Sequence, residues 1–147
     1  MKKLFSVIAT GSLLTLMVVV AHAQLPGIPI RASIPFDFNV RGRMLPAGNY
    51  EITRINDEPE GLMIRNVDHR RDKALFRTEP IDVAGSSRKN VLVFHRYGDS
   101  YFLSEVETAG EQTGQELTPS RAERQLRHEM ETARGQSAVE TVTVAAN

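Results

Sequence analysis

The stretch VLVFHRYGDSYFLSEV, residues 91 to 106, predicts the central hairpin of a β protein. Gly98 and Asp99 form a two-residue turn signal between two apolar runs, and such a turn fixes the register of its strands. The predicted cross-strand pairs are Arg96 with Tyr101, His95 with Phe102, Phe94 with Leu103, and Val93 with Ser104. This register places Val91, Val93, His95, Phe102 and Val106 on one face, and Leu92, Phe94, Arg96, Tyr101 and Leu103 on the other. Because both faces carry apolar residues, we expect the hairpin to lie centrally in a sheet.

The same stretch contains His95, Asp99 and Ser100, the three residue types of a hydrolase triad. In a tight hairpin the turn residues lie about 7 to 13 Å along the ladder from His95. A triad needs one partner at each ring nitrogen, at about 3 Å. We therefore expect Asp99 to serve the geometry of the turn, and we assign no catalytic residue.

Strands are predicted on the N-terminal side of this hairpin by alternating apolar residues. Residues 32 to 40, ASIPFDFNV, alternate strictly, with Ile34, Phe36, Phe38 and Val40 on one face. Pro35 lacks an N–H, which favours a sheet edge or a position near the start of the strand. A turn over 41 to 49 leads to a strand that carries Tyr50 and Ile52 on one face, and further strands are predicted at 62 to 67 and 73 to 78. The spacing predicts an all-β, mainly antiparallel fold, either a β-sandwich or a partly open barrel of six to eight strands.

The C-terminal part predicts a loop or long hairpin arm after Ala109 and then one amphipathic helix over about 120 to 134. Ser120 and Glu123 form a capping box, and Gly135 stands where a C-cap glycine belongs. Glu123 and Arg127 are spaced for an i, i+4 ion pair, and the helix is expected to lie on the outside of the sheet. Residues 137 to 145 predict a final strand or a tail, because they contain the β-branched residues Val139, Thr141, Val142, Thr143 and Val144.

The first 23 residues have the pattern of a Sec-type signal peptide. Lys2 and Lys3 precede an apolar run from Leu4 to Val20, and Ala21-His22-Ala23 forms a small-x-small cleavage site. Residues 24 to 31 predict an extended leader, and residues 32 to 147 a single β domain. We therefore expect an exported protein, periplasmic or extracellular, without a transmembrane segment after cleavage.

Composition narrows the function classes further. The chain has no cysteine, which excludes disulfides and an acylated lipoprotein signal. Two of the 18 basic residues precede the cleavage site, so 16 remain against 18 acidic residues and the mature net charge is −2. A near-neutral exported protein is not expected to bind nucleic acid. A chain of this length can bury roughly two-thirds of its unfolded surface, enough for one domain without disulfides.

Candidate ligand contacts are few. His69, His95 and His128 have no metal-ligand spacing, so we expect no metal and no cofactor. The basic turn that contains Arg70 and Arg71 is either a site for an anionic group or a solvated turn, because Asp68 and Asp72 flank it. The candidate contacts to a ligand or partner are His95, Arg96, Tyr97, Tyr101, Arg70 and Arg71.

Three blocks resemble a group of small exported bacterial proteins of unassigned function that is common in acidobacterial genomes. They are IPFDFNVRGRMLPAGNYEI (34 to 52), VLVFHRYGDSYFLSEV (91 to 106) and GQELTPSRAERQL (114 to 126). The resemblance implies export, a compact β domain and a trailing helix. It implies no activity and no functional residue.

Together these features favour a non-enzymatic binding or structural module of the cell envelope or extracellular space, with another envelope or secreted protein as its partner. The expected contact elements are the arginine-bearing face of the helix and the tail from Val139 to Val144, which could add to a partner's sheet edge. The alternative is a small-ligand carrier whose barrel cavity is lined by Ile34, Phe36 and Phe38. A small hydrolase ranks third, because no nucleophile, metal site or carboxylate pair stands at motif spacing.

Overall fold

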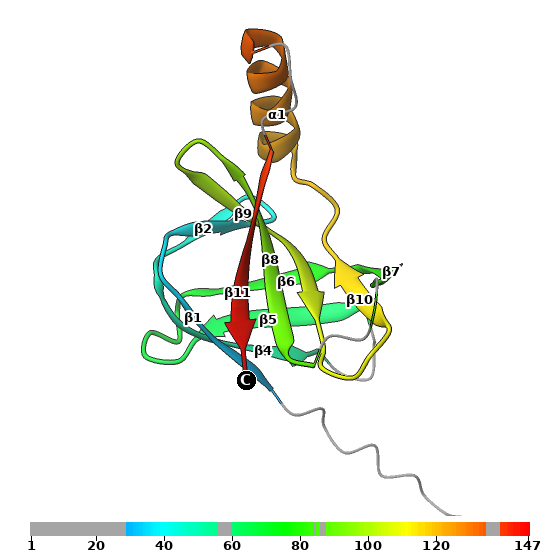
Figure 1. Ribbon diagram of the computed structural model, residues 1–147. Coiled ribbons are helices and arrows are strands. Elements are labelled where there is room, and N and C mark those ends of the chain that lie inside the picture. The colour runs from blue at the N-terminus through cyan, green and yellow to red at the C-terminus, as the bar shows by residue number, and fades with distance from the viewer. Residues whose placement is uncertain (1–28, 56–59, 84, 86–87, 135–138) are drawn as a thin grey trace, which may run out of the picture.

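The computed structural model describes residues 29–55, 60–83, 85, 88–134 and 139–147. These residues form a mainly β fold with one helix (Figure 1). The elements are β1 (Ile30–Ile34), β2 (Phe38–Val40), β3 (Arg43–Leu45), β4 (Gly48–Arg54), β5 (Gly61–Asn66), β6 (Lys73–Arg77), β7 (Glu79–Asp82), β8 (Asn90–Tyr97), β9 (Ser100–Glu107), β10 (Thr113–Glu116), α1 (Arg121–Arg134) and β11 (Glu140–Ala146). The predicted β class and C-terminal helix are confirmed. The expectation of six to eight strands was too low, because β3, β7 and β10 are short strands within segments expected to be turns or loops.

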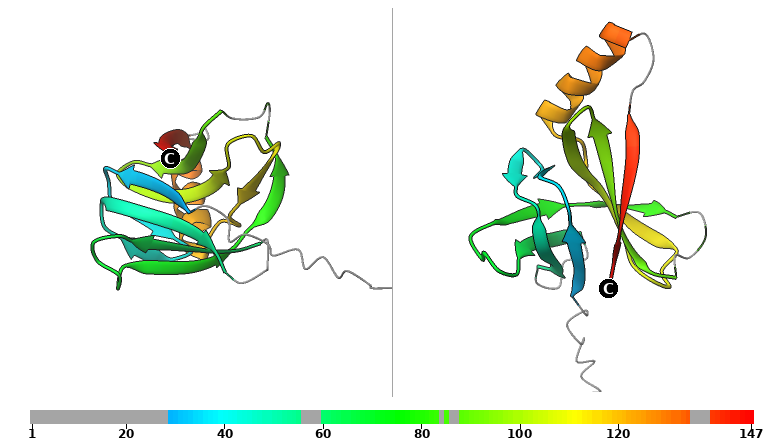
Figure 2. Two further views of the ribbon diagram at one scale, coloured as in Figure 1. Left: turned by 90° about the horizontal axis from the view of Figure 1, so that it is seen from below. Right: turned by 60° about the vertical axis from the view of Figure 1, so that its left-hand side comes forward.

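The strands form one mixed sheet that curls into a nearly closed barrel (Figure 2). Its order is β3-β2-β9-β8-β11-β1-β4-β5-β6, with β10 joined to β9 and β7 joined to β10. Among the described strands, β2 runs parallel to β9, with Asn39 opposite Phe102, and the other pairs are antiparallel. The β8–β9 hairpin is central, as predicted, because β11 and β2 flank it.

The segment predicted as one strand over 32 to 40 is two strands, β1 and β2, separated by residues 35 to 37. β1 lies between β11 and β4, and β2 lies between β9 and β3, so neither is the sheet edge that the proline suggested. Pro35 follows β1 because it has no N–H for a further ladder bond. The alternation itself is confirmed, since Ile34, Phe38 and Val40 are buried. Strand β1 also begins earlier than expected. Ile30 and Arg31, which were assigned to the leader, pair with Ile52 and Glu51 of β4.

The interior of the barrel is filled by side chains from both halves of the sheet. Phe38 and Phe94 are fully buried, and their ring centroids lie 5.5 Å apart in an edge-to-face contact. Tyr50 meets Phe38 at 5.1 Å, and its hydroxyl donates to the Pro46 carbonyl at 2.7 Å. Burial of each such side chain stabilises the fold by about 1.5 to 3 kcal/mol. The Phe38 side of the predicted carrier cavity is therefore occupied by aromatic packing.

The C-terminal segment contributes a central strand. Residues predicted as a strand or tail form β11, whose residues Glu140 to Ala146 pair with Arg96 to Asn90 of β8. Ala146 also pairs with Ala32 of β1, and Asn147 exchanges two backbone hydrogen bonds with Arg31 at 2.8 Å. β11 thus has β8 along one edge and β1 at its C-terminal end on the other, so of the two predicted alternatives, strand or tail, the segment is a strand.

Helix α1 projects from the end of the barrel opposite the C-terminus (Figures 1 and 2). It is the only helix in the described part of the chain, and it is too short and too polar to cross a membrane. The predicted signal peptide, residues 24 to 28 of the leader, and Gly135 lie outside the described residues.

Candidate functional site

A β-bulge in β9 shapes the surface beneath α1. The predicted register holds from the turn to Phe94 and Leu103, but Val93 then pairs with Glu105 instead of Ser104. An unbroken register would place Glu105 opposite Leu92, in the core, and would turn Val106 outward. Burial of an unpaired carboxylate is costly, whereas the extra residue brings Val106 opposite Leu92, where it is 2% exposed. The prediction that Val106 shares a face with His95 and Val93, the outer face of the barrel, was therefore wrong.

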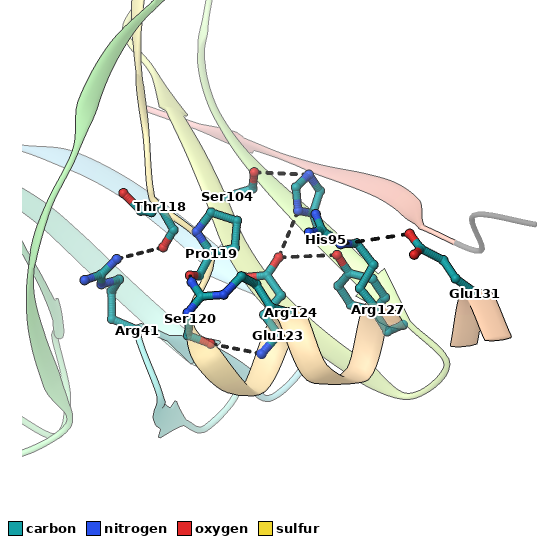
Figure 3. Close-up of polar contacts among 11 residues, drawn as sticks. Arg41, His95, Ser104, Thr118, Pro119, Ser120, Glu123, Arg124, Arg127 and Glu131 are labelled. Atoms are coloured by element: carbon teal, nitrogen blue, oxygen red, sulfur yellow. Dashed lines mark hydrogen bonds and ion pairs between the residues drawn. The ribbon is translucent and has the colours of Figure 1, made fainter. Parts of the chain in front are cut away.

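Three polar side chains from separate elements meet on that outer face. His95 of β8 stands between Ser104 of β9 and Glu123 of α1 (Figure 3). The Ser104 Oγ lies 3.2 Å from His95 Nε2, and Glu123 Oε1 lies 3.0 Å from His95 Nδ1. Ser104 is 3% exposed and Glu123 is 5% exposed, while 26% of the His95 side chain is open to solvent. We call this arrangement the Ser104–His95–Glu123 relay.

The proton positions of the relay follow from the chemistry of its members. An ionised carboxylate can only accept hydrogen bonds, so His95 Nδ1 carries the hydrogen that faces Glu123. When the imidazole is neutral, Nε2 is therefore the acceptor, and the Ser104 hydroxyl donates to it. When the imidazole is protonated, Nε2 donates to Ser104 Oγ instead. In both arrangements the three groups stay hydrogen-bonded.

The relay also fixes the base of α1. The Glu123 N–H donates to Ser120 Oγ at 3.1 Å, which confirms Ser120 as the N-cap. The Glu123 carboxylate bonds His95 and does not pair with Arg127; Arg127 instead lies 4.0 Å from Glu131. The predicted Glu123–Arg127 ion pair was thus wrong, because the half-buried His95 takes the carboxylate.

The linker before α1 is tied to the same place. The Leu117 N–H donates to the carbonyl of Ser104 at 2.7 Å, and Arg41 Nη1 donates to the carbonyl of Thr118 at 2.8 Å. Arg124 donates to the carbonyl of Pro119 (Figure 3). These bonds hold residues 117 to 123 against the bulge, while the rest of α1 extends beyond the sheet.

Two ionisable groups near the relay have shifted pKa values. Burial raises the pKa of Tyr97, whose hydroxyl lies 3.5 Å from Glu123 Oε1, and the negative charge of Glu123 adds to this effect. Burial also raises the pKa of Glu105, with further contributions from Glu116 and Glu107. In both groups the loss of hydration on burial is the largest cause of the raised pKa.

The candidate contact residues separate into three groups. His95 and the buried Tyr97 lie on the α1 side of the hairpin. Arg96 and Tyr101 pair on the opposite face, where the Arg96 guanidinium carbon lies 5.5 Å from the Tyr101 ring centroid. Tyr101 in turn stacks on Phe36 at 3.9 Å.

The basic turn forms the third group. Arg70 and Arg71 are exposed in the turn between β5 and β6, which β11, β1 and β4 separate from β8 in the sheet. Within the described residues, no cluster of three or more potential metal ligands occurs.

Sequence reasoning missed Ser104 and Glu123 as partners of His95. Asp99 is exposed at the tip of the hairpin and Ser100 pairs with Tyr97. Asp99, Ser100 and His95 therefore do not form a triad. A signal for Ser104 did exist, because the predicted register placed it diagonal to His95 on one face. Glu123 was recognised only as a capping residue, since nothing local in the sequence links α1 to β8.

A pocket of about 330 Å³ lies elsewhere, between the β2–β3 turn and strands β5 and β6. It is lined by Arg41, Ile55, Gly61, Leu75, Phe76 and Arg77. Its lining combines two cationic side chains with apolar ones, which suits a molecule that has an anionic group and an apolar part.

Comparison of the chain with protein-family models, curated proteins and solved structures finds no match.

Proposed function

We propose that this protein is an exported, non-enzymatic binding or structural module of the cell envelope or extracellular space, and that α1 is its contact element. The observation that carries the proposal is the projection of α1 from the barrel (Figure 1). Arg121, Arg124 and Arg127 are exposed, whereas Leu126 and Met130 are only half-buried. An amphipathic helix with a partly uncovered apolar side can dock into a groove of a partner protein.

The anchoring of α1 supports this role. Its first turn is held by Ser120 and by the buried carboxylate of Glu123. A helix fixed at its base presents its exposed side chains in a defined direction, which lowers the entropy lost on binding. The β11 strand contributes less than the sequence suggested, because β8 pairs with it along its length.

A site-specific photo-crosslinker tests the proposal in the native envelope. Placed at Gln125, which is exposed on α1, it should give one dominant adduct of defined mass. Placed at Thr141, an exposed residue of β11, it should not give that adduct. The double substitution Arg124→Glu/Arg127→Glu should weaken the adduct, while Arg70→Glu/Arg71→Glu, an equal charge change on a distant turn, should leave it intact. If the adduct is retained in Arg124→Glu/Arg127→Glu but lost in Arg70→Glu/Arg71→Glu, the contact site lies on the turn and not on α1.

Export is tested separately. N-terminal sequencing of the protein recovered from the periplasm or medium should begin at Gln24, if the predicted signal peptide is removed after Ala23. Recovery of only the full-length chain in the cytoplasm would contradict this part of the proposal.

A small-ligand carrier is the second candidate, and the 330 Å³ pocket is the observation that favours it. The cavity originally expected, lined by Ile34, Phe36 and Phe38, is less favourable, since Phe38 and Phe36 both pack against Phe94. A carrier should co-purify with an anionic amphiphile that is lost when Arg41 is replaced by Ala. Native mass spectrometry of the purified protein would detect it.

A further inference from the structure

The partner-binding role proposed above requires no chemistry from the Ser104–His95–Glu123 relay, yet the relay has the arrangement of a general-base device. A serine hydroxyl meets one imidazole nitrogen at 3.2 Å, and a carboxylate meets the other at 3.0 Å. We propose that Ser104 is a base-activated nucleophile that accepts an acyl group from an activated ester.

The tautomer of His95 is the first support. The Glu123 carboxylate requires a hydrogen on Nδ1, which leaves the lone pair of Nε2 facing the Ser104 hydroxyl. A histidine that removes a proton from serine needs this tautomer. Glu123 is 5% exposed and its backbone is fixed by the Ser120 cap, so the imidazole is held in one orientation.

The bulge is the second support. Bulges commonly re-aim a side chain beside a functional site. Here the bulge makes Ser104 the extra residue of β9, without a partner on β8, and its Oγ lies 3.2 Å from His95 Nε2. Ser100, at the start of the same strand, pairs regularly with Tyr97.

The reaction balances with the groups present. Ser104 Oγ forms a bond to the carbonyl carbon of the ester while its proton passes to His95 Nε2. The bond between that carbon and the leaving oxygen then breaks, and Nε2 returns the proton to the leaving group, which departs as an alcohol or phenol. The products are a Ser104 ester and that alcohol, without oxidation or reduction. The negative charge of Glu123 stabilises the imidazolium formed between the two steps.

The burial of Ser104 limits the size of the acyl donor that can reach it. The residue is 3% exposed, and residues 117 to 123 run past it, with Leu117 bonded to its carbonyl and Glu123 bonded to His95. A slender acyl group should therefore react faster than a bulky one, and loosening of the first turn of α1 should widen this access.

The test uses the full mature chain with p-nitrophenyl acetate. Release of p-nitrophenol gives the rate, and peptide mass spectrometry locates the acetyl group. We expect acetylation of Ser104 in the native protein and its loss in Ser104→Ala. Ser100→Ala, a serine of the same strand, is the matched control and should react like the native chain. His95→Ala should slow acetylation of Ser104 by a factor on the order of 100.

A second variant, Glu123→Gln, tests the proposal independently if His95→Ala does not fold. Glu123→Gln keeps a hydrogen-bonding side chain beside Nδ1 but removes the charge, and it should lower the rate about tenfold or more while circular dichroism stays native. Absence of Ser104 acetylation in the native protein would overturn the proposal, and so would a rate that does not depend on His95. The cross-link at Gln125 should be unchanged in Ser104→Ala, so the nucleophile and the partner-binding role can fail independently.

Discussion

The carboxylate of Glu123 and the imidazole of His95 lie 3.0 Å apart, and this contact joins the first turn of α1 to strand β8 of the barrel. Glu123 is buried, so its charge needs this partner. The contact therefore sets the direction in which α1 leaves the sheet, and the proposed contact surface depends on it.

Replacement of Glu123 by Ala should destabilise the protein by about 1.5 to 3 kcal/mol, because it removes a hydrogen bond to a charged group and leaves His95 Nδ1 without this acceptor. Urea unfolding followed by circular dichroism measures the change. Glu129→Ala, an exposed carboxylate two turns further along α1, is the matched control and should change stability by less than about 0.5 kcal/mol. Equal losses in both variants would mean that the contact with His95 adds nothing beyond helix propensity.

Loss of the N-cap gives a second prediction. Ser120→Ala removes the acceptor for the Glu123 N–H and should cost about 1 kcal/mol. Ser120→Asp should retain most of that stability, since aspartate is also a strong N-cap and its charge suits the helix N-terminus. The same urea titration compares the three proteins. An Asp variant as unstable as the Ala variant would contradict the capping role.

The raised pKa of Glu105 predicts a dependence of stability on pH. Burial, with Glu116 and Glu107, raises the pKa of Glu105 above its ordinary value of 4.5. The folded protein then holds the Glu105 proton more tightly than the unfolded chain, so this group favours folding fully below pH 4.5 and progressively less as pH rises through the folded pKa. Glu105→Gln should therefore gain stability relative to the native chain between pH 4 and pH 7. Melting temperatures of the native chain and of Glu105→Gln across this range provide the measurement, and an equal pH dependence in the two proteins would contradict the prediction.

The core provides a fourth prediction. Phe94→Ala should destabilise the fold by about 3 to 5 kcal/mol, because the ring is fully buried and meets both Phe36 and Phe38 edge to face. Met44→Ala, at a side chain that is 62% exposed, should change stability by less than about 0.5 kcal/mol. Chemical unfolding distinguishes the two. A small loss for Phe94→Ala would mean that the interior closes around the missing ring.

Local patterns in the sequence predicted local structure well. Gly98 and Asp99 located the central turn, the alternation from Ile34 to Val40 located the inward face, and Ser120 located the start of α1. These features depend on neighbouring residues, so a single stretch of chain contains the information.

Contacts between distant segments could not be predicted in the same way. The parallel pairing of β2 with β9, the pairing of β11 with β8 and the contact of Glu123 with His95 all join residues far apart in the chain. The bulge at Ser104 is an intermediate case. The predicted register places the charged Glu105, and not the apolar Val106, opposite the core residue Leu92. Only the observed ladder shows that a bulge brings Val106 to that position.

The placement of β11 has a consequence for the order of folding. This strand, at residues 140 to 146, completes the join between β8 and β1, so the barrel cannot close before those residues have been synthesised. Pairing over such long sequence separations is slow, and a chain with an unclosed barrel exposes the free edges of β8 and β1. We infer that such a chain depends on protection from aggregation until β11 has paired with β8 and β1.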